Sequence, residues 1–369
     1  ASAGGARSQG LGEAPAGAVS PEVFEAVVVA VRDETTADRG DHAQLVQSLE
    51  VRQVTGAAVG RTLVVENGQW SAVNVNRYAV GDRLVVEATT HADGVASYFI
   101  TDYVRRGPMA WLFALFVACV VVVGRLRGVA SLLGMGLSFV LLFTFVLPQI
   151  GAGRDPIVVT ILAAAVIIPL TFYLAHGPNR KTTAAVGGTP ITLVLTGLLA
   201  RVAVDATRMT GFGGEEAYFL QIASEGEINL RGLLMASIIV GLLGILDDIT
   251  VSQAAIVQQL KHASPGLSLG ELYGRAMDVG RDHIASLVNT LVLVYASSAM
   301  PLLLLFVGDD VRFGEAINYE HVAVEVVRTL VASIGLIAAV PITTTLACAL
   351  VRGEAADGDS GAAGHGHPH

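Results

Sequence analysis

The sequence predicts a membrane α-helical bundle of about seven transmembrane helices, with an N-terminal extracytoplasmic β domain that forms a small barrel of the OB or SH3-like kind. The chain has 369 residues, of which 53% are hydrophobic and 15% charged, and its mean hydropathy is +0.60. After Pro108 the apolar residues are gathered into helix-length blocks, which is typical of an integral membrane protein. Before that point, short runs rich in β-branched residues alternate with turn-type clusters, which indicates strands.

The first twenty residues are rich in Ala, Gly and Ser without any periodicity, and we expect residues 1–20 to be a disordered lead-in. The first residue is Ala1 rather than Met. Either this segment follows a removed signal or anchor, or the sequence simply starts here.

The predicted β domain covers residues 21–106. Five short strands suit a small barrel. The predicted strands are 24–31, 49–54, 61–66, 83–89 and 96–104. Trp70, Tyr78, Tyr98 and Tyr103 either form a stacking surface or, as is more ordinary, pack in the barrel core. The domain has no basic stripe and the formal net charge is -9, so we expect no nucleic-acid partner.

The predicted transmembrane domain covers residues 107–352, followed by a disordered cytoplasmic tail at 353–369. Each of seven apolar blocks approaches the roughly 20 residues that span a bilayer. The blocks are 108–124, 129–150, 156–175, 186–206, 230–259, 284–307 and 322–351. Cys119 and Cys348 lie inside such blocks, where we expect them to be small core residues.

Basic residues are concentrated in alternate short loops, whereas the opposite loops mix fewer of them with acidic residues. By the positive-inside rule the basic loops and the carboxyl terminus are cytoplasmic, and the β domain is extracytoplasmic. The basic-loop residues are Arg125, Arg127, Arg180, Lys181, Lys261, Arg275, Arg281 and Arg352.

The most unusual stretch is 230–262, which carries Asp247 and Asp248 about halfway along an apolar block. A continuous helix here would be roughly 45 to 50 Å long, whereas the hydrocarbon layer is roughly 30 Å thick. A carboxylate at membrane depth costs some 2.5 to 3.5 kcal/mol and marks a pathway, a relay or a paired site. On a helix the two side chains point about 100° apart.

Two interpretations of the pair remain open. If the aspartates face the bundle, they form a proton or cation site to which Thr250, Ser252 and Gln253 add neutral oxygen ligands. If the span ends near Leu246, they lie at the cytoplasmic interface instead. Apart from such a bound cation, whose metal is unknown, we expect no cofactor. The preceding glycines, Gly241 and Gly244, permit close helix approach or local unwinding.

A second polar set lies on the sixth block, where Asp282, Ser286 and Asn289 share one helix face. An Asn inside a span favours an interhelical partner, so we expect Asn289 and Ser286 to face the Asp pair. Asp282 either joins them or caps the helix.

Two further sets are expected to be supporting or structural. His321, Glu325 and Arg328 recur on one face of the last block and either support the site or form a structural ion pair. Arg201 and Asp205 have the spacing of a structural pair within one helix.

The segments outside the spans carry three weaker patterns. Residues 264–280 predict a short amphipathic helix at the inner interface, and the acidic loop 209–229 predicts a lid or a docking surface. The tail holds His365, His367 and His369, which either bind a metal loosely or are incidental.

Three runs of sequence resemble one known family. The runs GLLGILDDITVSQAAIV, VGRDHIASLVNTLVLVYASSAMPLLLL and ITDYVRRG are similar to the YibE/F-like family of multi-pass bacterial membrane proteins, over about Val23 to Val351. The loop GFGGEEAYFL also resembles that family. The resemblance implies the bacterial cell (inner) membrane and points to Asp247, Asp248, Ser252 and Gln253 as motif positions. Because its members are mostly described as membrane proteins or permeases, it implies no substrate.

The predicted function is a secondary transporter or permease of a cation or small solute, with the Asp pair as its ion or proton site. The alternative is a membrane-anchored assembly or sensor subunit whose β domain binds an envelope protein partner. In both cases the lipid bilayer is a partner, and a homo-oligomer fits either. The sequence has no GxSxG, Walker or HExxH motif, so we do not expect an enzyme.

Overall fold

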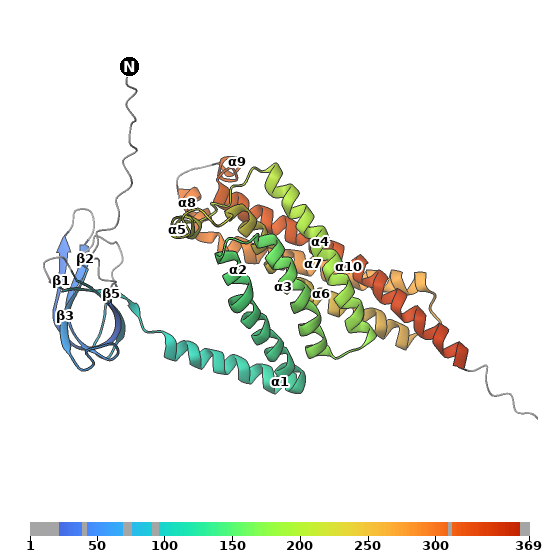
Figure 1. The fold of residues 1–369 in the computed structure, drawn as a ribbon, viewed down its shortest axis with the longest axis horizontal. Helices are drawn as coiled ribbons and strands as arrows, with labels where there is room; N and C mark the ends of the chain where they lie inside the picture. The colour runs from blue at the N-terminus through green and yellow to red at the C-terminus, as the bar shows by residue number, and fades with distance from the viewer. Residues whose placement is uncertain (1–21, 39–42, 69–75, 91–95, 309–311, 362–369) are drawn as a thin grey trace, which may run out of the picture. The chain divides into compact units, whose positions relative to one another are not determined.

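The structure is a computed structural model that describes residues 22–38, 43–68, 76–90, 96–308 and 312–361 (Figure 1). The chain divides into two compact units, Ala1–Phe116 and Val117–His369, and each has its own apolar core. All the strands lie in the first unit, which also includes the start of the helix that begins at Arg106, and the second unit is helical.

The first unit holds one antiparallel sheet with the strand order β3-β2-β1-β4-β5. The edge strands β3 and β5 contact each other, so the sheet curls into a half-barrel. All five predicted strands are confirmed, and the closed OB or SH3-like barrel stays a prediction. The strands are β1 (Glu22–Asp38), β2 (Ala43–Gln53), β3 (Thr62–Asn67), β4 (Arg83–Thr90) and β5 (Ala96–Tyr103).

Alternation of apolar and polar residues places one face of this sheet in the core. In β1, for example, Phe24, Ala26 and Val28 are buried. Irregularities in the pairing with β2 follow at Val28/Ala30 and Val31/Asp33, and such bulges bend a strand. This bending lets one long strand pair with β2 on one side and β4 on the other.

The described tyrosines of the β domain pack against its core. Tyr78 is buried, and its ring lies 4.9 Å from that of Tyr103 between centroids. Tyr98 lies edge-on to Phe24 at 6.3 Å. Of the two interpretations, core packing therefore describes these three tyrosines, while Trp70 lies outside the described residues.

Gln47 fixes the segment that leads into β4. It is fully buried, and its amide donates to the Tyr78 carbonyl at 3.0 Å and accepts from the Tyr78 N–H at 2.9 Å. One side chain thus pairs both backbone groups of a residue that has no strand neighbour, which a buried backbone requires.

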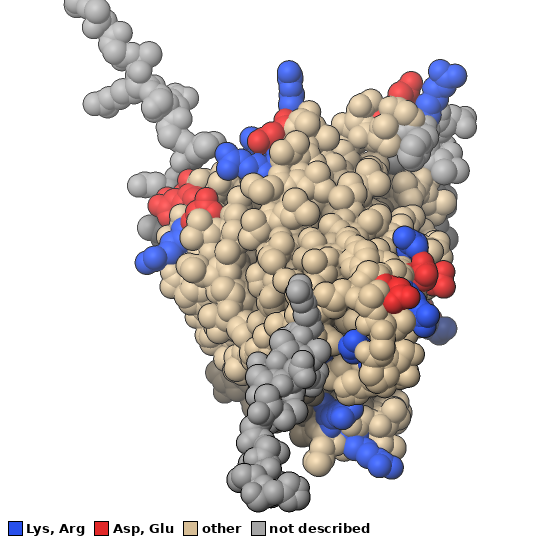
Figure 2. All heavy atoms as spheres, turned by 90° about the vertical axis from the view of Figure 1, so that its right-hand side faces the viewer, with Lys and Arg blue, Asp and Glu red and all other residues tan. Residues whose placement is uncertain are grey.

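The helical unit contains five stretches that are long and apolar enough to cross a membrane among the described residues. They are Arg106–Gly151, Pro156–His176, Arg180–Ala206, Leu230–Ala263 and Glu320–Val351. In Figure 2 most visible atoms belong to uncharged residues, and the charged side chains gather in separate groups. The protein is therefore a multi-pass membrane protein, whereas the predicted count of seven spans is not confirmed.

The helices follow the predicted blocks, except that α10 continues to Gly361, into the predicted tail, and except at two further places. Their bounds are α1 (Arg106–Leu141), the π-helical turn η1 (Leu142–Val146), α2 (Leu147–Gly151), α3 (Pro156–His176), α4 (Arg180–Ala206), α5 (Glu215–Ala223), α6 (Leu230–Ala263), α7 (Leu269–Ser298), α8 (Met300–Gly308), α9 (Phe313–Ala316) and α10 (Glu320–Gly361).

The first difference is a kink where the sequence predicts a loop between two spans. Arg125 has φ 51° and ψ -135°, which is not helical, so α1 consists of two helices that meet at this residue. Gly128 follows in the bend, where an added Cβ would lie 2.3 Å from the Val120 carbonyl oxygen. Only glycine fits that approach.

The second difference concerns the predicted interfacial helix at 264–280. It is not separate, because α7 begins at Leu269 and continues without a break to Ser298. A capping box of Ser268 and Glu271 starts this helix. The predicted sixth span is instead divided at Ala299, between α7 and α8.

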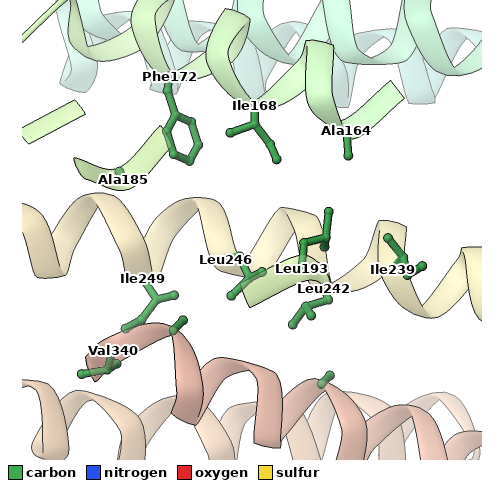
Figure 3. Packing of buried hydrophobic residues seen from close by; sticks show 12 residues of the cluster. Ala164, Ile168, Phe172, Ala185, Leu193, Ile239, Leu242, Leu246, Ile249 and Val340 are labelled. Atoms are coloured by element: carbon green, nitrogen blue, oxygen red, sulfur yellow. The ribbon is translucent and has the colours of Figure 1, made fainter. Parts of the chain in front are cut away.

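Helix α6 forms the centre of the bundle. Figure 3 shows it between α3, which contributes Ile168 and Phe172, and α10, which contributes Val340. Small residues bring the neighbouring helices close. A Cβ on Gly188 of α4 would lie 2.6 Å from Thr343 Oγ1 of α10, and one on Gly335 of α10 would lie 2.5 Å from Thr196 Oγ1 of α4.

Candidate functional site: the Asp247 cavity

Helices α3 and α6 start at the same level and run in the same direction, which fixes the position of Asp247 along the bundle. A Cβ on Gly232, near the start of α6, would lie 3.1 Å from Cδ of Pro156, the first residue of α3. In Figure 3 the residue numbers increase in the same direction along both helices, from Ala164 to Phe172 in α3 and from Ile239 to Ile249 in α6. Fifteen residues separate Gly232 from Asp247, a rise of about 22 Å, and the 21 residues of α3 rise by about 31 Å. Asp247 therefore lies within the length of α3, nearer its carboxyl end.

At this level Asp247 lines a cavity of about 440 Å³. Its walls are the second half of α1 together with η1, then α3, and then α6. The carboxylate is half-buried, and α6 adds Val240, Leu243 and Gly244 to the same wall. Most of the lining is apolar. The polar residues that line it with Asp247 are Ser131, Ser138, Thr160, Thr171 and His176.

The cavity hydroxyls are partly occupied by their own helices. Ser138 donates to the Gly134 carbonyl at 3.0 Å, and Thr171 donates to the Ile167 carbonyl at 2.8 Å. Each hydroxyl oxygen keeps its acceptor capacity. The cavity thus offers a carboxylate and a few oxygen acceptors within a largely hydrocarbon surface.

The structure separates the two aspartates. Asp248 is exposed on the outer side of α6, whereas Asp247 lines the cavity. The turn of about 100° between adjacent helical residues explains the separation.

The predicted neutral ligands lie on the opposite side of α6, in the core. Thr250 is buried and donates to the Leu246 carbonyl at 2.7 Å, with Thr189 Oγ1 of α4 2.9 Å away. Gln253 is also buried, and its amide donates to the Ala276 carbonyl at 3.0 Å and to Thr344 Oγ1 at 2.8 Å. These contacts join α6 to α4, α7 and α10. Ser252 is half-buried and does not line the cavity.

The predicted partners on α7 do not meet the Asp pair within this chain. Helix α7 buries the stripe Leu272, Ala276, Gly280 and Leu291, which turns its polar face outward. As a result Asp282, Ser286 and Asn289 are exposed.

The polar residues at the start of α10 form an ion pair at the other end of α6. Arg328 Nη1 lies 2.7 Å from Glu325 Oε1, and its Nη2 donates to Ser237 Oγ at 3.4 Å. Glu325 and Arg328 thus form an ion pair, and whether it supports the site or is purely structural stays a prediction. His321 instead lies beside the ring of Tyr319, at 5.8 Å between centroids.

The predicted pairing of Arg201 with Asp205 is wrong. Asp205 Oδ1 accepts from Arg231 Nη2 of α6 at 2.6 Å. The physical reason is that α4 ends where α6 begins, so a cation on the neighbouring helix reaches the carboxylate.

The sequence reasoning missed the walls of the cavity that α1 and α3 supply. A signal was present, because Ser131, Gly134 and Ser138 recur at helical spacing, as do Thr160 and Thr171 with small residues between them. Small and hydroxyl residues on one face of an apolar helix mark a surface that other groups approach.

Among the described residues, no group of three or more His, Cys, Asp or Glu side chains is placed to hold a metal ion. The tail histidines His365, His367 and His369 lie outside the described residues. A lone carboxylate in apolar surroundings is suited to a proton or to a cation that carries its other ligands with it.

The helices and the cavity define a multi-pass membrane protein in which one carboxylate, Asp247, lines a largely apolar cavity. The family model described as YibE/F-like protein matches residues 112–353, which is most of the chain. The chain therefore belongs to the YibE/F-like family. The matched range begins after β5, so the β domain lies outside it. No curated protein and no solved structure matches the chain.

Proposed function

We propose that this protein is a secondary transporter or permease of a small solute in the bacterial cell membrane, and that Asp247 is its proton or cation site. The observation that carries the proposal is the position of Asp247, within the length of α3 and on the wall of a cavity of about 440 Å³. Ionisable side chains inside membrane helices mark substrate or ion pathways.

The lining favours a solute over a metal cation as the cargo. The cavity volume of about 440 Å³ falls within the range of small-molecule sites. Hard cations need six or more oxygen ligands, whereas here most of the lining is hydrocarbon. The cargo is a solute with an apolar body and one or two hydrogen-bonding groups, and the proton or cation at Asp247 drives its movement.

The proposed topology has seven crossings. The stretch Arg106–Gly151 has 46 residues, about 69 Å of helix, which is more than twice the hydrocarbon thickness. The kink at Arg125 divides it into two crossings, four further stretches add one each, and α7 with α8 supplies the seventh. An odd number of crossings places the β domain and the carboxyl terminus on opposite sides, with the basic loops in the cytoplasm.

A flux measurement in proteoliposomes tests the proposal. A pH-sensitive dye inside the vesicles records proton movement when members of a panel of small amphiphilic solutes are added outside. We expect Asp247→Asn to lower the solute-dependent flux at least about tenfold, which corresponds to about 1.4 kcal/mol, because the variant cannot take up a proton. Asp248→Asn is the matched control on the exposed side of the same helix, and it should keep most of the flux.

Two outcomes contradict the proposal. Equal flux in Asp247→Asn and the wild type removes the carboxylate from the mechanism. If the wild type shows no flux with any solute, or with Na⁺ or K⁺ in place of the proton gradient, the transporter assignment fails.

A further inference from the structure

A second cavity, of about 300 Å³, lies at the end of the bundle where α4 begins and where α6 and α10 approach their carboxyl ends. A third cavity adjoins it and shares Lys181, Gln258 and His262 with it. These cavities are separate from the Asp247 cavity, with which they share no lining residue.

The polar lining of these two cavities is basic or amide in character. Arg180 and Lys181 come from the first turn of α4, and Lys261 and His262 come from the last turn of α6. Asn179, Gln258 and Gln259 add carboxamides, and among the side chains that the structure describes no lining residue is acidic. The described lining therefore carries a net positive charge.

The backbone adds to this positive character. Helix α4 has 27 residues, and its amino terminus, capped by Asn179, opens at the cavity. A helix amino terminus carries a partial positive charge that favours anions. The Lys261 ammonium donates to the carbonyls of Pro265 and Leu267, at 2.7 and 3.1 Å. These carbonyls hold the ammonium in place but, being neutral, leave its charge available.

The remaining lining is apolar. It consists of Ala254, Ala255 and Ala263 of α6 and of Ala347, Leu350 and Val351 of α10. A cationic rim over a hydrocarbon surface, at the end of a membrane bundle, matches a phosphate with a lipid chain attached to it. Basic sites between membrane helices bind such head groups.

We infer that the cavity between α4, α6 and α10 binds a phosphate group, which either an anionic phospholipid or free phosphate presents. Lys181 and His262 are the basic binding residues that line both the second and the third cavity. Lys261 is held by the adjoining loop and supplies charge from a fixed position.

The test measures phospholipid binding to the full-length protein in detergent. Phosphatidylglycerol and phosphatidylcholine are titrated separately, and bound lipid is counted by native mass spectrometry. We expect saturable binding of phosphatidylglycerol, and about fivefold weaker binding in Lys181→Gln, because one basic residue near an anionic lipid contributes about 1 kcal/mol. His262→Gln weakens binding in the same direction, and Lys181→Arg restores the wild-type affinity.

Arg275→Gln is the matched control, because Arg275 is exposed near the start of α7 and lines neither cavity. It should leave binding within about twofold of the wild type, which is about 0.4 kcal/mol. A monodisperse elution profile for each variant shows that folding is intact.

A separate titration with inorganic phosphate distinguishes the two sources. If inorganic phosphate binds and displaces phosphatidylglycerol, the site accepts free phosphate; if only the lipid binds, its source is the bilayer. The inference is overturned if neither binds saturably, if Lys181→Gln binds as the wild type does, or if Arg275→Gln weakens binding to the same extent. None of these results depends on solute flux. The inference is therefore tested independently of the proposed transport.

Discussion

At Gly188, α4 and α10 pack so closely that a side chain would not fit between them. A Cβ there would lie 2.6 Å from Oγ1 of Thr343, whose side chain is fully buried. Its neighbour Gly187 is exposed, and a Cβ there would meet only Leu346 Cδ1, at 3.7 Å.

These adjacent glycines provide a matched pair of substitutions. We expect Gly188→Ala to lower the stability of the bundle by about 1–3 kcal/mol, because the added methyl overpacks the contact between the helices. Gly187→Ala should leave stability unchanged or raise it, since alanine favours a helix. Thermal melting in detergent, followed by the monodisperse fraction, measures both. Equal melting temperatures would show that α10 moves freely away from α4.

For individual residues, the sequence predicted which kind of side chain matters better than it predicted the direction in which that side chain points. It singled out Asp247 as a membrane carboxylate but treated it with Asp248 as one pair. Whether Asp247 or Asp248 faces a cavity depends on the rotation of α6 about its axis relative to α3. Buried residues such as Leu242 and Leu246 set that rotation. Asn289 shows the same limit, because the apolar stripe of α7 decides which way its polar face turns.

Among the elements, α1 carries the strain of a sharp bend. Arg125 has a positive φ of 51°, a backbone conformation that L-residues adopt at a cost of about 1–3 kcal/mol and glycine adopts readily. The sequence marked this point correctly as an interruption between two apolar blocks. It did not show that the interruption is a kink of one residue rather than a loop.

We therefore expect Arg125→Gly to raise the stability of the bundle by about 1 kcal/mol. Arg127→Gly, two residues further on and also exposed, should lower it by about 1 kcal/mol, because glycine weakens a regular helix. The melting temperatures of the two variants in detergent check this difference in sign. If both variants are destabilised equally, the backbone at Arg125 is helical in the membrane.

At the scale of the whole molecule, the two units have separate cores and should unfold separately. Gln47 offers a way to test this, because its amide pairs both backbone groups of Tyr78. We expect Gln47→Leu to lower the stability of the β domain by about 3 kcal/mol, since those groups lose their partner. For a domain of this size the unfolding temperature falls by about 12 °C or more.

Calorimetry of the full chain in detergent makes the measurement. The transition of the helical unit should stay where it is in Gln47→Leu, and Arg52→Gln, exposed on the same strand, should change neither transition. In Gly188→Ala the transition of the helical unit should move, and that of the β domain should stay where it is. A single transition that shifts as a whole in both variants would mean that the units unfold together.

The architecture at this scale followed from the sequence because composition and periodicity report burial directly. Blocks of apolar residues predicted the membrane helices, and alternation predicted all five strands. The number of crossings did not follow, since α7 mixes apolar residues with Asp282, Ser286 and Asn289, and length alone cannot divide Arg106–Gly151.

The buried hydroxyls of the core have a mechanical consequence. Thr189, Thr192 and Thr196 of α4 each donate to a carbonyl four residues earlier in their own helix, as Thr344 of α10 does. A hydroxyl that bonds to the backbone of its own helix does not need a partner on a neighbouring helix. Among these threonines, the side-chain hydrogen bonds that do cross to α6 join Thr189 with Thr250 and Thr344 with Gln253. These two hydrogen bonds tie α6 to α4 and α10 at about one and two turns beyond Asp247.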